Sequence, residues 1–103
     1  MTKKNDERNR FAIQHGFRPD TRPGVRRYEA ALTSPEGSVL WIDVYHDNTK
    51  REKNWFVRKM NANLVSNLHY EFSKADGGEK SAWKQAIGLV NDLMKSGYTL
   101  QEV

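Results

Sequence analysis

Alternating apolar and polar positions mark two β-strands in the first half of the chain. The run RRYEAALT, residues 26–33, places Tyr28, Ala30 and Leu32 at every second position, which is the period of a half-buried strand. The run VLWIDVYH, residues 39–46, is rich in β-branched and aromatic residues. Between them, SPEGS supplies the Pro and Gly of a tight turn. The pattern predicts an antiparallel hairpin.

The two faces of the second strand differ in character, because successive side chains of a strand point to opposite sides. One face carries Leu40, Ile42, Val44 and His46, and we take it as the core face. The other face carries Val39, Trp41, Asp43 and Tyr45. Exposed apolar patches are uncommon in monomers. We therefore expect Trp41 and Tyr45 to be covered by the N-terminal segment or a helix, or else to contact a partner.

A third strand and a fourth follow. NWFVRKM, residues 54–60, alternates again and fits a strand that forms a hairpin with 39–46. The segment 61–76 is ambiguous, because its apolar residues fit both a strand and the i, i+4 spacing of a helix. Its Tyr and Phe favour a sheet and its three Asn disfavour a helix interior. We interpret 67–73 as a strand.

The last element is an amphipathic helix over about 79–96. Its apolar residues recur every three or four positions and form one stripe: Trp83, Ala86, Ile87, Val90, Leu93 and Met94. Asp76 and Glu79 have the spacing of a capping box, and Gly97 occupies the position of a helix-ending residue with positive φ. The tail, with Tyr98, Leu100 and Val103, is expected to fold back as a short edge strand or a docked segment.

These elements predict an α+β fold: an antiparallel sheet of three to four strands packed by one C-terminal helix. The first 22 residues are polar and basic and are interrupted by Gly16 and Pro19. We expect them to form a flexible basic N-terminal arm ahead of a single domain over 23–103. A chain of 103 residues is long enough for one core only.

Composition narrows the chemistry further. The chain has no Cys, which excludes disulfides and thiolate metal sites and is compatible with the cytoplasm. It has no apolar run of the length that a membrane span needs, so no membrane association is expected. The three histidines, His15, His46 and His69, form no metal-binding motif, and Asp43 and His46 are expected on opposite faces of their strand. We therefore predict no enzyme, no metal and no cofactor, and keep a small basic RNase-like toxin as the third hypothesis.

Positive charge is concentrated in two segments. The net charge of +4 divides into +5 over residues 1–27, −4 over 28–47, +4 over 48–59 and −1 over 60–103. Basic side chains neutralise phosphates, and aromatic rings stack on unpaired bases. The sequence thus predicts a nucleic-acid-binding accessory or regulatory protein, for RNA or for single-stranded or duplex DNA. The basic residues assigned to binding are Arg26, Arg27, Lys50, Arg51, Lys53, Arg58 and Lys59.

A protein partner is the alternative. Trp41 and Tyr45 supply aromatic surface that the predicted strand places away from the core. With no active-site motif in the sequence, this surface also suits a protein-binding inhibitor or an immunity-type module of a phage or mobile element. The edge of a small sheet can also pair with a second copy, so a homodimer stays open.

Overall fold

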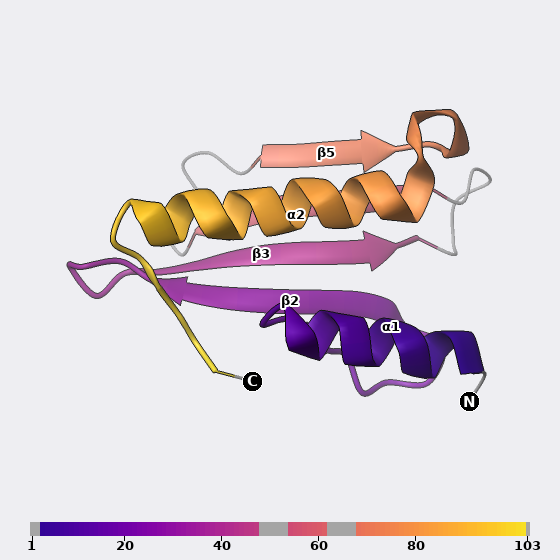
Figure 1. Cartoon of the computed structure of the whole chain (residues 1–103), viewed down its shortest axis with the longest axis horizontal. Coiled ribbons are helices and arrows are strands. Elements are labelled where there is room, and N and C mark those ends of the chain that lie inside the picture. The colour runs from indigo at the N-terminus through magenta and orange to yellow at the C-terminus, as the bar shows by residue number, and fades with distance from the viewer. Residues whose placement is uncertain (1–2, 48–53, 62–67, 103) are drawn as a thin grey trace.

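The computed structural model describes residues 3–47, 54–61 and 68–102. The elements run in the order α1 (Lys3–Gln14), β1 (Arg18–Pro19), β2 (Arg26–Thr33), β3 (Val39–His46), β4 (Trp55–Asn61), β5 (Leu68–Phe72), a 3₁₀ turn (Lys74–Asp76), α2 (Gly78–Lys95) and β6 (Thr99–Leu100) (Figure 1). The α+β fold is confirmed. Within the described residues the sheet has six strands, two of them only two residues long, in place of the predicted three to four.

The sheet is antiparallel throughout and follows the chain order. Its strands lie in the order β1-β2-β3-β4-β5, and β6 pairs with β2 beside β1. The predicted hairpins are confirmed by their registers, in which Ala30 faces Ile42 and Val44 faces Val57. Leu68–Phe72 forms the fourth predicted strand, in a register that sets Val57 against Tyr70. The aromatic content of this segment therefore outweighed its helical spacing.

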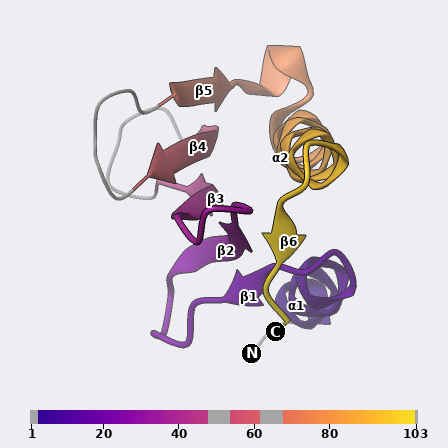
Figure 2. The ribbon, with the colours of Figure 1, turned by 90° about the vertical axis from the view of Figure 1, so that its left-hand side faces the viewer.

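Both helices cover the same face of the sheet, which we call the helix face (Figure 2). The predicted core residues Leu40, Ile42 and Val44 lie on it and are buried. They belong to a cluster that also includes Tyr28, Leu32, Val57, Trp83, Ala86 and Val90. The period-2 pattern of the sequence thus correctly identified the core side of β2 and β3.

The C-terminal helix agrees with the prediction in its bounds and in most of its apolar stripe, although Met94 at the end of the stripe is 46% exposed. Ala82, Trp83, Ala86 and Val90 are its buried residues. Gly97 ends it with φ +97°. The predicted capping box is displaced: Asp76 Oδ2 accepts a hydrogen bond from the Ser73 backbone N at 3.3 Å and so caps the 3₁₀ turn, while Gly77 is the N-cap of α2. The capping box therefore lies three residues upstream of the predicted one, between Ser73 and Asp76.

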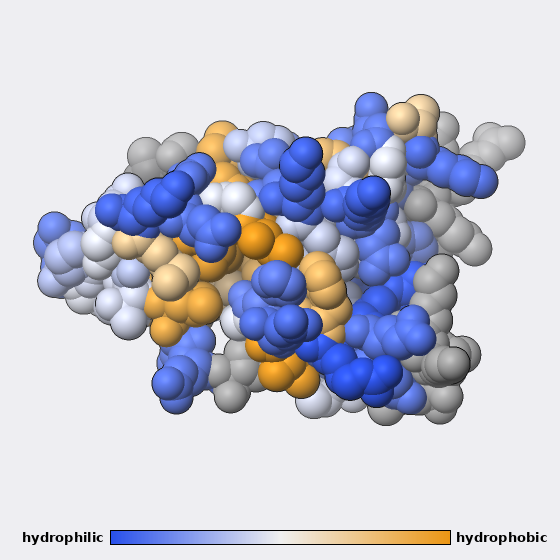
Figure 3. Space-filling model, in the orientation of Figure 1, coloured by the Kyte–Doolittle hydropathy of each residue, from blue (hydrophilic) through white to orange (hydrophobic). Residues whose placement is uncertain are grey.

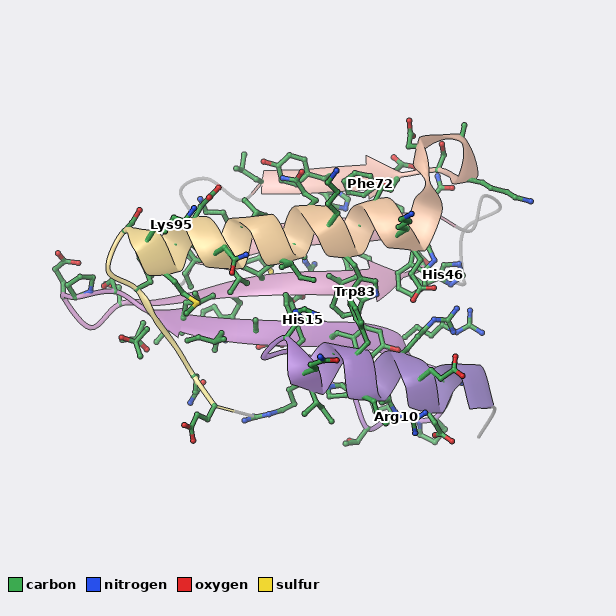
Figure 4. The ribbon with its side chains drawn as sticks, in the orientation of Figure 1. Arg10, His15, His46, Phe72, Trp83 and Lys95 are labelled. Atoms are coloured by element: carbon green, nitrogen blue, oxygen red, sulfur yellow. The ribbon has the colours of Figure 1, made fainter. Side chains whose placement is uncertain are left out.

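The prediction of a flexible N-terminal arm over residues 1–22 is wrong. Residues Lys3–Gln14 form α1, and Ala12 and Phe17 are completely buried. Trp83 of α2 lies between the two helices (Figure 4), with its ring centroid 5.2 Å from that of Phe17. Arg8 Nε also donates a hydrogen bond to Glu79 Oε2 at 2.8 Å. Tertiary packing thus stabilises a helix whose sequence alone gives a weak signal.

The C-terminal tail folds back, as expected. Leu100 of β6 faces Leu32 of β2, and Gln101 N donates to Ala31 O at 2.8 Å. Val103 lies outside the described residues. Because β1 pairs with the other end of β2, the two short strands share one long edge.

The outer surface of the two helices is largely hydrophilic (Figure 3). Hydrophobic side chains show between them, in a cleft of about 520 Å³ whose lining includes Ile13, Ile87, Met94 and Leu100. In the part of the chain that is described, neither helix has the length and apolar character that crossing a bilayer requires.

Candidate binding site on the open face of the sheet

The face of the sheet opposite the two helices is the candidate site, and we call it the open face (Figure 2). The registers place on it Arg27 and Glu29 of β2, Trp41, Asp43 and Tyr45 of β3, Phe56 and Arg58 of β4, and His69 and Glu71 of β5. The two helices do not cover Trp41 and Tyr45, because α1 and α2 both pack on the helix face (Figure 2). Arg18, from the N-terminal segment, instead lines a cavity together with Trp41. Trp41 and Tyr45 are half-buried.

Two arginines share one buried carboxylate at the centre of the open face. Arg27 Nη2 lies 2.8 Å and Arg58 Nη2 2.9 Å from Asp43 Oδ2. Asp43 is completely buried, whereas the two arginine side chains are about one third exposed. Such charge-assisted bonds fix the position of both guanidinium groups. Asp43 thus presents two cations side by side on one surface.

This cluster still has unused hydrogen-bonding capacity. Asp43 Oδ1 and the Nε atoms of Arg27 and Arg58 have no partner among the described residues. A guanidinium has five N–H donors, and buried polar groups are normally paired. These three atoms are themselves buried, so a ligand would contact the exposed third of each arginine side chain and not the unpaired atoms.

Acidic side chains limit the positive charge on one side of the cluster. Arg27 Nη2 is also 3.6 Å from Glu29 Oε2, whose side chain is 40% exposed. On the other side, the Arg58 guanidinium lies 5.1 Å above the Tyr45 ring, a cation–π geometry. Arg27 thus has a second acid within reach, whereas Arg58 contacts an aromatic ring.

Three aromatic rings stack beside the arginines. The Tyr45 and Phe56 centroids are 5.2 Å apart with planes 15° from parallel, and the Phe56 and His69 centroids are 5.2 Å apart at 19°. Tyr45 Oη and His69 Nε2 share a hydrogen bond of 3.0 Å. Burial raises the pKa of Tyr45 above its ordinary value, so its hydroxyl is protonated at neutral pH. Phe56 is buried and His69 exposed, which leaves Tyr45 and His69 as the accessible rings.

A small cavity lies at the edge of the open face, beside β2. Its volume is about 220 Å³, and its lining includes Arg18, Glu29, Ala31, Trp41 and Gln101. Pockets for drug-sized ligands are larger, about 300–1,000 Å³. The cavity suits one small planar group, with Trp41 as an apolar wall and charged groups of both signs at its rim.

The structure separates the predicted binding residues into three groups. Arg27, Arg58, Trp41 and Tyr45 meet on the open face. Arg26 and Lys59 lie on the helix face, opposite His46 and Ile42 respectively, so they do not join the other arginines. Lys50, Arg51 and Lys53 lie outside the described residues.

The sequence missed three contributors to this site: Asp43 as the shared anion, and Phe56 and His69 as stacked rings. The alternation of β4 already placed Phe56 and Arg58 on one face. What was lacking was the register between strands, which decides that Arg58 faces Asp43 and His69 faces Arg58. Local periodicity gives the face of a residue but not its neighbour.

The histidines do not come together. His46 lies on the helix face and His69 on the open face, and Asp43 and His46 point to opposite sides, as the strand period predicted. Among the described residues, no group of three or more His, Asp or Glu side chains is placed to hold a metal ion.

Comparisons with protein-family models, with curated proteins and with solved structures found no match to this chain.

Proposed function

We propose that the open face binds single-stranded nucleic acid, either RNA or single-stranded DNA. The observation that carries this proposal is the placement of Arg27 and Arg58 on a shared carboxylate, next to the accessible rings of Trp41 and Tyr45. A sheet face with cations and aromatic rings in alternation suits a flexible strand whose phosphates and bases are both accessible.

The contacts expected with a bound strand follow from the geometry. Each guanidinium uses one nitrogen on Asp43 and keeps other N–H groups for a phosphate oxygen. An unpaired base can stack on Trp41 or Tyr45 for about 1–3 kcal/mol. The cavity walled by Trp41 has room for one small planar group such as a base. The open face therefore combines the two interactions that sequence-tolerant binding needs.

The segment that joins β3 to β4 adds charge in the sequence. Residues 48–53 contain Lys50, Arg51 and Lys53 against a single acid, Glu52. These basic residues follow β3 in the sequence, shortly after Tyr45 and His46, and β3 is the strand that carries Trp41 and Tyr45. It extends the electrostatic attraction for a polyanion.

Binding of fluorescently labelled oligouridylate and oligothymidylate, measured by anisotropy between about 20 and 200 mM salt, tests the proposal. Affinity is expected at low salt and should fall linearly on a log–log plot, with a slope of about −0.7 for each phosphate neutralised. The pair of changes Arg51→Glu and Lys53→Glu should weaken it. Undetectable affinity for both oligonucleotides at low salt would refute nucleic-acid binding.

Matched charge variants locate the binding surface. Arg58→Gln removes one cation from the open face, and Lys84→Gln removes one from the exposed side of α2. Only Arg58→Gln should reduce the salt slope, by about one phosphate contact. Trp41 is the half-buried one of the three tryptophans, so oligonucleotide should quench its fluorescence, and Trp41→Phe should abolish that quenching. Equal effects of Arg58→Gln and Lys84→Gln would place the binding elsewhere.

A protein-binding inhibitor or immunity-type module is the second candidate. Among the described residues, the open face and its edge carry charges of both signs, with Arg18, Arg27 and Arg58 near Glu29, Asp43 and Glu71, and such a mixed surface suits a protein. Affinity capture with the whole chain, before and after nuclease treatment, separates the two candidates. A stoichiometric protein that survives nuclease and is lost with Trp41→Ala favours the second candidate.

A further inference from the structure

We propose that β5 forms an edge-to-edge antiparallel pair with β5 of a second copy, joining two sheets into one. This inference is independent of the proposed function, because it rests on the edge of the sheet and not on its open face.

The two edges of the sheet differ in whether short strands pair with them. The outer edge of β2 is covered by β1 at one end and β6 at the other. Within residues 3–47, 54–61 and 68–102, β5 pairs with β4 and with no other strand. An edge strand without a neighbour presents main-chain N–H and C=O groups that can pair with another chain.

The register decides which groups of β5 point outward. Arg27 O accepts a hydrogen bond from Asp20 N, and Ala31 O accepts one from Gln101 N, so the odd-numbered residues of β2 direct their main-chain groups to the outer edge. In an antiparallel sheet these directions alternate along each strand and match across each pair. The same alternation can be followed from β2 through β3 and β4 by the pairing registers. It places the main-chain N–H and C=O groups of His69 and Glu71 at the free edge of β5.

The sequence of β5, LHYEF, is complementary to itself about Tyr70. An antiparallel pair centred there sets His69 against Glu71 of the second copy, twice, and Leu68 against Phe72 of the second copy, twice. The outward N–H and C=O groups of His69 and Glu71 then face one another, as a hydrogen-bonded pair requires. Shifting the register by two residues either way would place His69 against His69 or Glu71 against Glu71, which is unfavourable for the like-charged carboxylates.

An exposed apolar side chain and a nearby groove support this register. Leu68 is 44% exposed although it lies in a strand. Phe72 lines a groove of about 370 Å³ between β5 and α2, together with Gly88 and Leu89 (Figure 4). Paired residues of antiparallel strands point to the same face. Leu68 of the second copy therefore enters beside Phe72 on the helix face, where its apolar surface leaves water.

The symmetry has a consequence for the shape of the dimer. Two antiparallel strands joined in one sheet are related by a two-fold axis perpendicular to the sheet, so both copies turn their helices to the same side. The two open faces then form one continuous surface, with His69 of each copy at the junction.

Sedimentation equilibrium of the full chain tests the pairing. The wild type is expected to be a reversible dimer. Glu71→Pro should make it a monomer, because proline removes an outward N–H without removing a hydrogen bond to β4. Glu71→Ala, the matched control, loses the same carboxylate but keeps the N–H and should still dimerise. A wild type that stays monomeric up to about 1 mM would overturn the proposal, as would a Glu71→Pro dimer of unchanged affinity.

A charge exchange provides the second test and decides the question if Glu71→Pro does not fold, as judged by circular dichroism. His69→Glu sets two carboxylates against each other at both contacts and should weaken the dimer by about tenfold or more. Adding Glu71→Lys sets opposite charges against each other at both contacts and should recover dimerisation. Failure of the double variant to recover, with both proteins folded, would contradict this register.

Discussion

Arg58 on β4 faces Asp43 on β3, and its Nη2 lies 2.9 Å from the buried Asp43 Oδ2. Arg27 reaches the same oxygen from β2 at 2.8 Å, so one carboxylate connects three consecutive strands. A buried carboxylate is expensive to desolvate, and two cations compensate that cost. The contact with Asp43 therefore both stabilises the sheet and holds in place Arg27 and Arg58, which are proposed to bind nucleic acid.

Asp43→Asn should lower the free energy of unfolding by about 2–4 kcal/mol, because it leaves two partly exposed guanidinium groups without their shared anion. Urea unfolding followed by circular dichroism measures this. Glu29→Gln is the control, since its ion pair with Arg27 is longer and more exposed, and its cost should be within about 0.5 kcal/mol. Equal losses for the two variants would show that Asp43 does not organise the cluster.

Phe17→Ala should cost about 3–5 kcal/mol, because Phe17 is completely buried and its ring packs edge-on against Trp83. Phe11 also contacts Trp83 at 5.2 Å but is 38% exposed, so Phe11→Ala should cost less than half as much. Thermal or urea unfolding of both variants compares them. A negligible effect of Phe17→Ala would mean that α1 and β1 do not belong to the folded core.

Gly16→Ala should destabilise the protein more than Gly24→Ala. Both glycines have positive φ, +84° and +76°, and alanine there costs about 1 kcal/mol of backbone strain. At Gly16 the new Cβ would also collide with the side chain of Leu100, whereas at Gly24 it would meet nothing within 4 Å. Unfolding midpoints of the two variants separate strain from collision. A Gly24→Ala midpoint as low as that of Gly16→Ala would contradict the docking of β6.

Stability should fall at alkaline pH. Burial raises the pKa of Tyr28 above its ordinary value of about 10. The unfolded chain therefore releases this proton first, so the stabilising contribution is complete below about pH 10 and is lost as pH rises toward the folded pKa. Urea unfolding at about pH 8, 10 and 11 should show the loss, and Tyr28→Phe should make the dependence shallower. Tyr45, whose pKa burial also raises, should keep part of the slope in that variant. An unchanged slope in Tyr28→Phe would contradict the predicted role of this residue.

Local periodicity was sufficient for the strands, their faces and the long helix. Ala30 and Ile42 could be assigned to the core because strand residues alternate, and Val90 because helix residues recur every three or four positions. Gly97 could be assigned to the helix end because few other residues adopt positive φ. Each of these features depends on residues that are close together in the chain, so the sequence alone is enough to predict it.

Only the tertiary structure decided the position of the N-terminal helix and the composition of the open face. The helix Lys3–Gln14 has a weak apolar pattern, and it is stabilised by distant residues such as Trp83 and Glu79. Alternation gives the face of a residue within its own strand, but it did not show that Arg27 and Arg58 meet at Asp43. Register depends on contacts between residues far apart in the chain, and those contacts form only when the strands align.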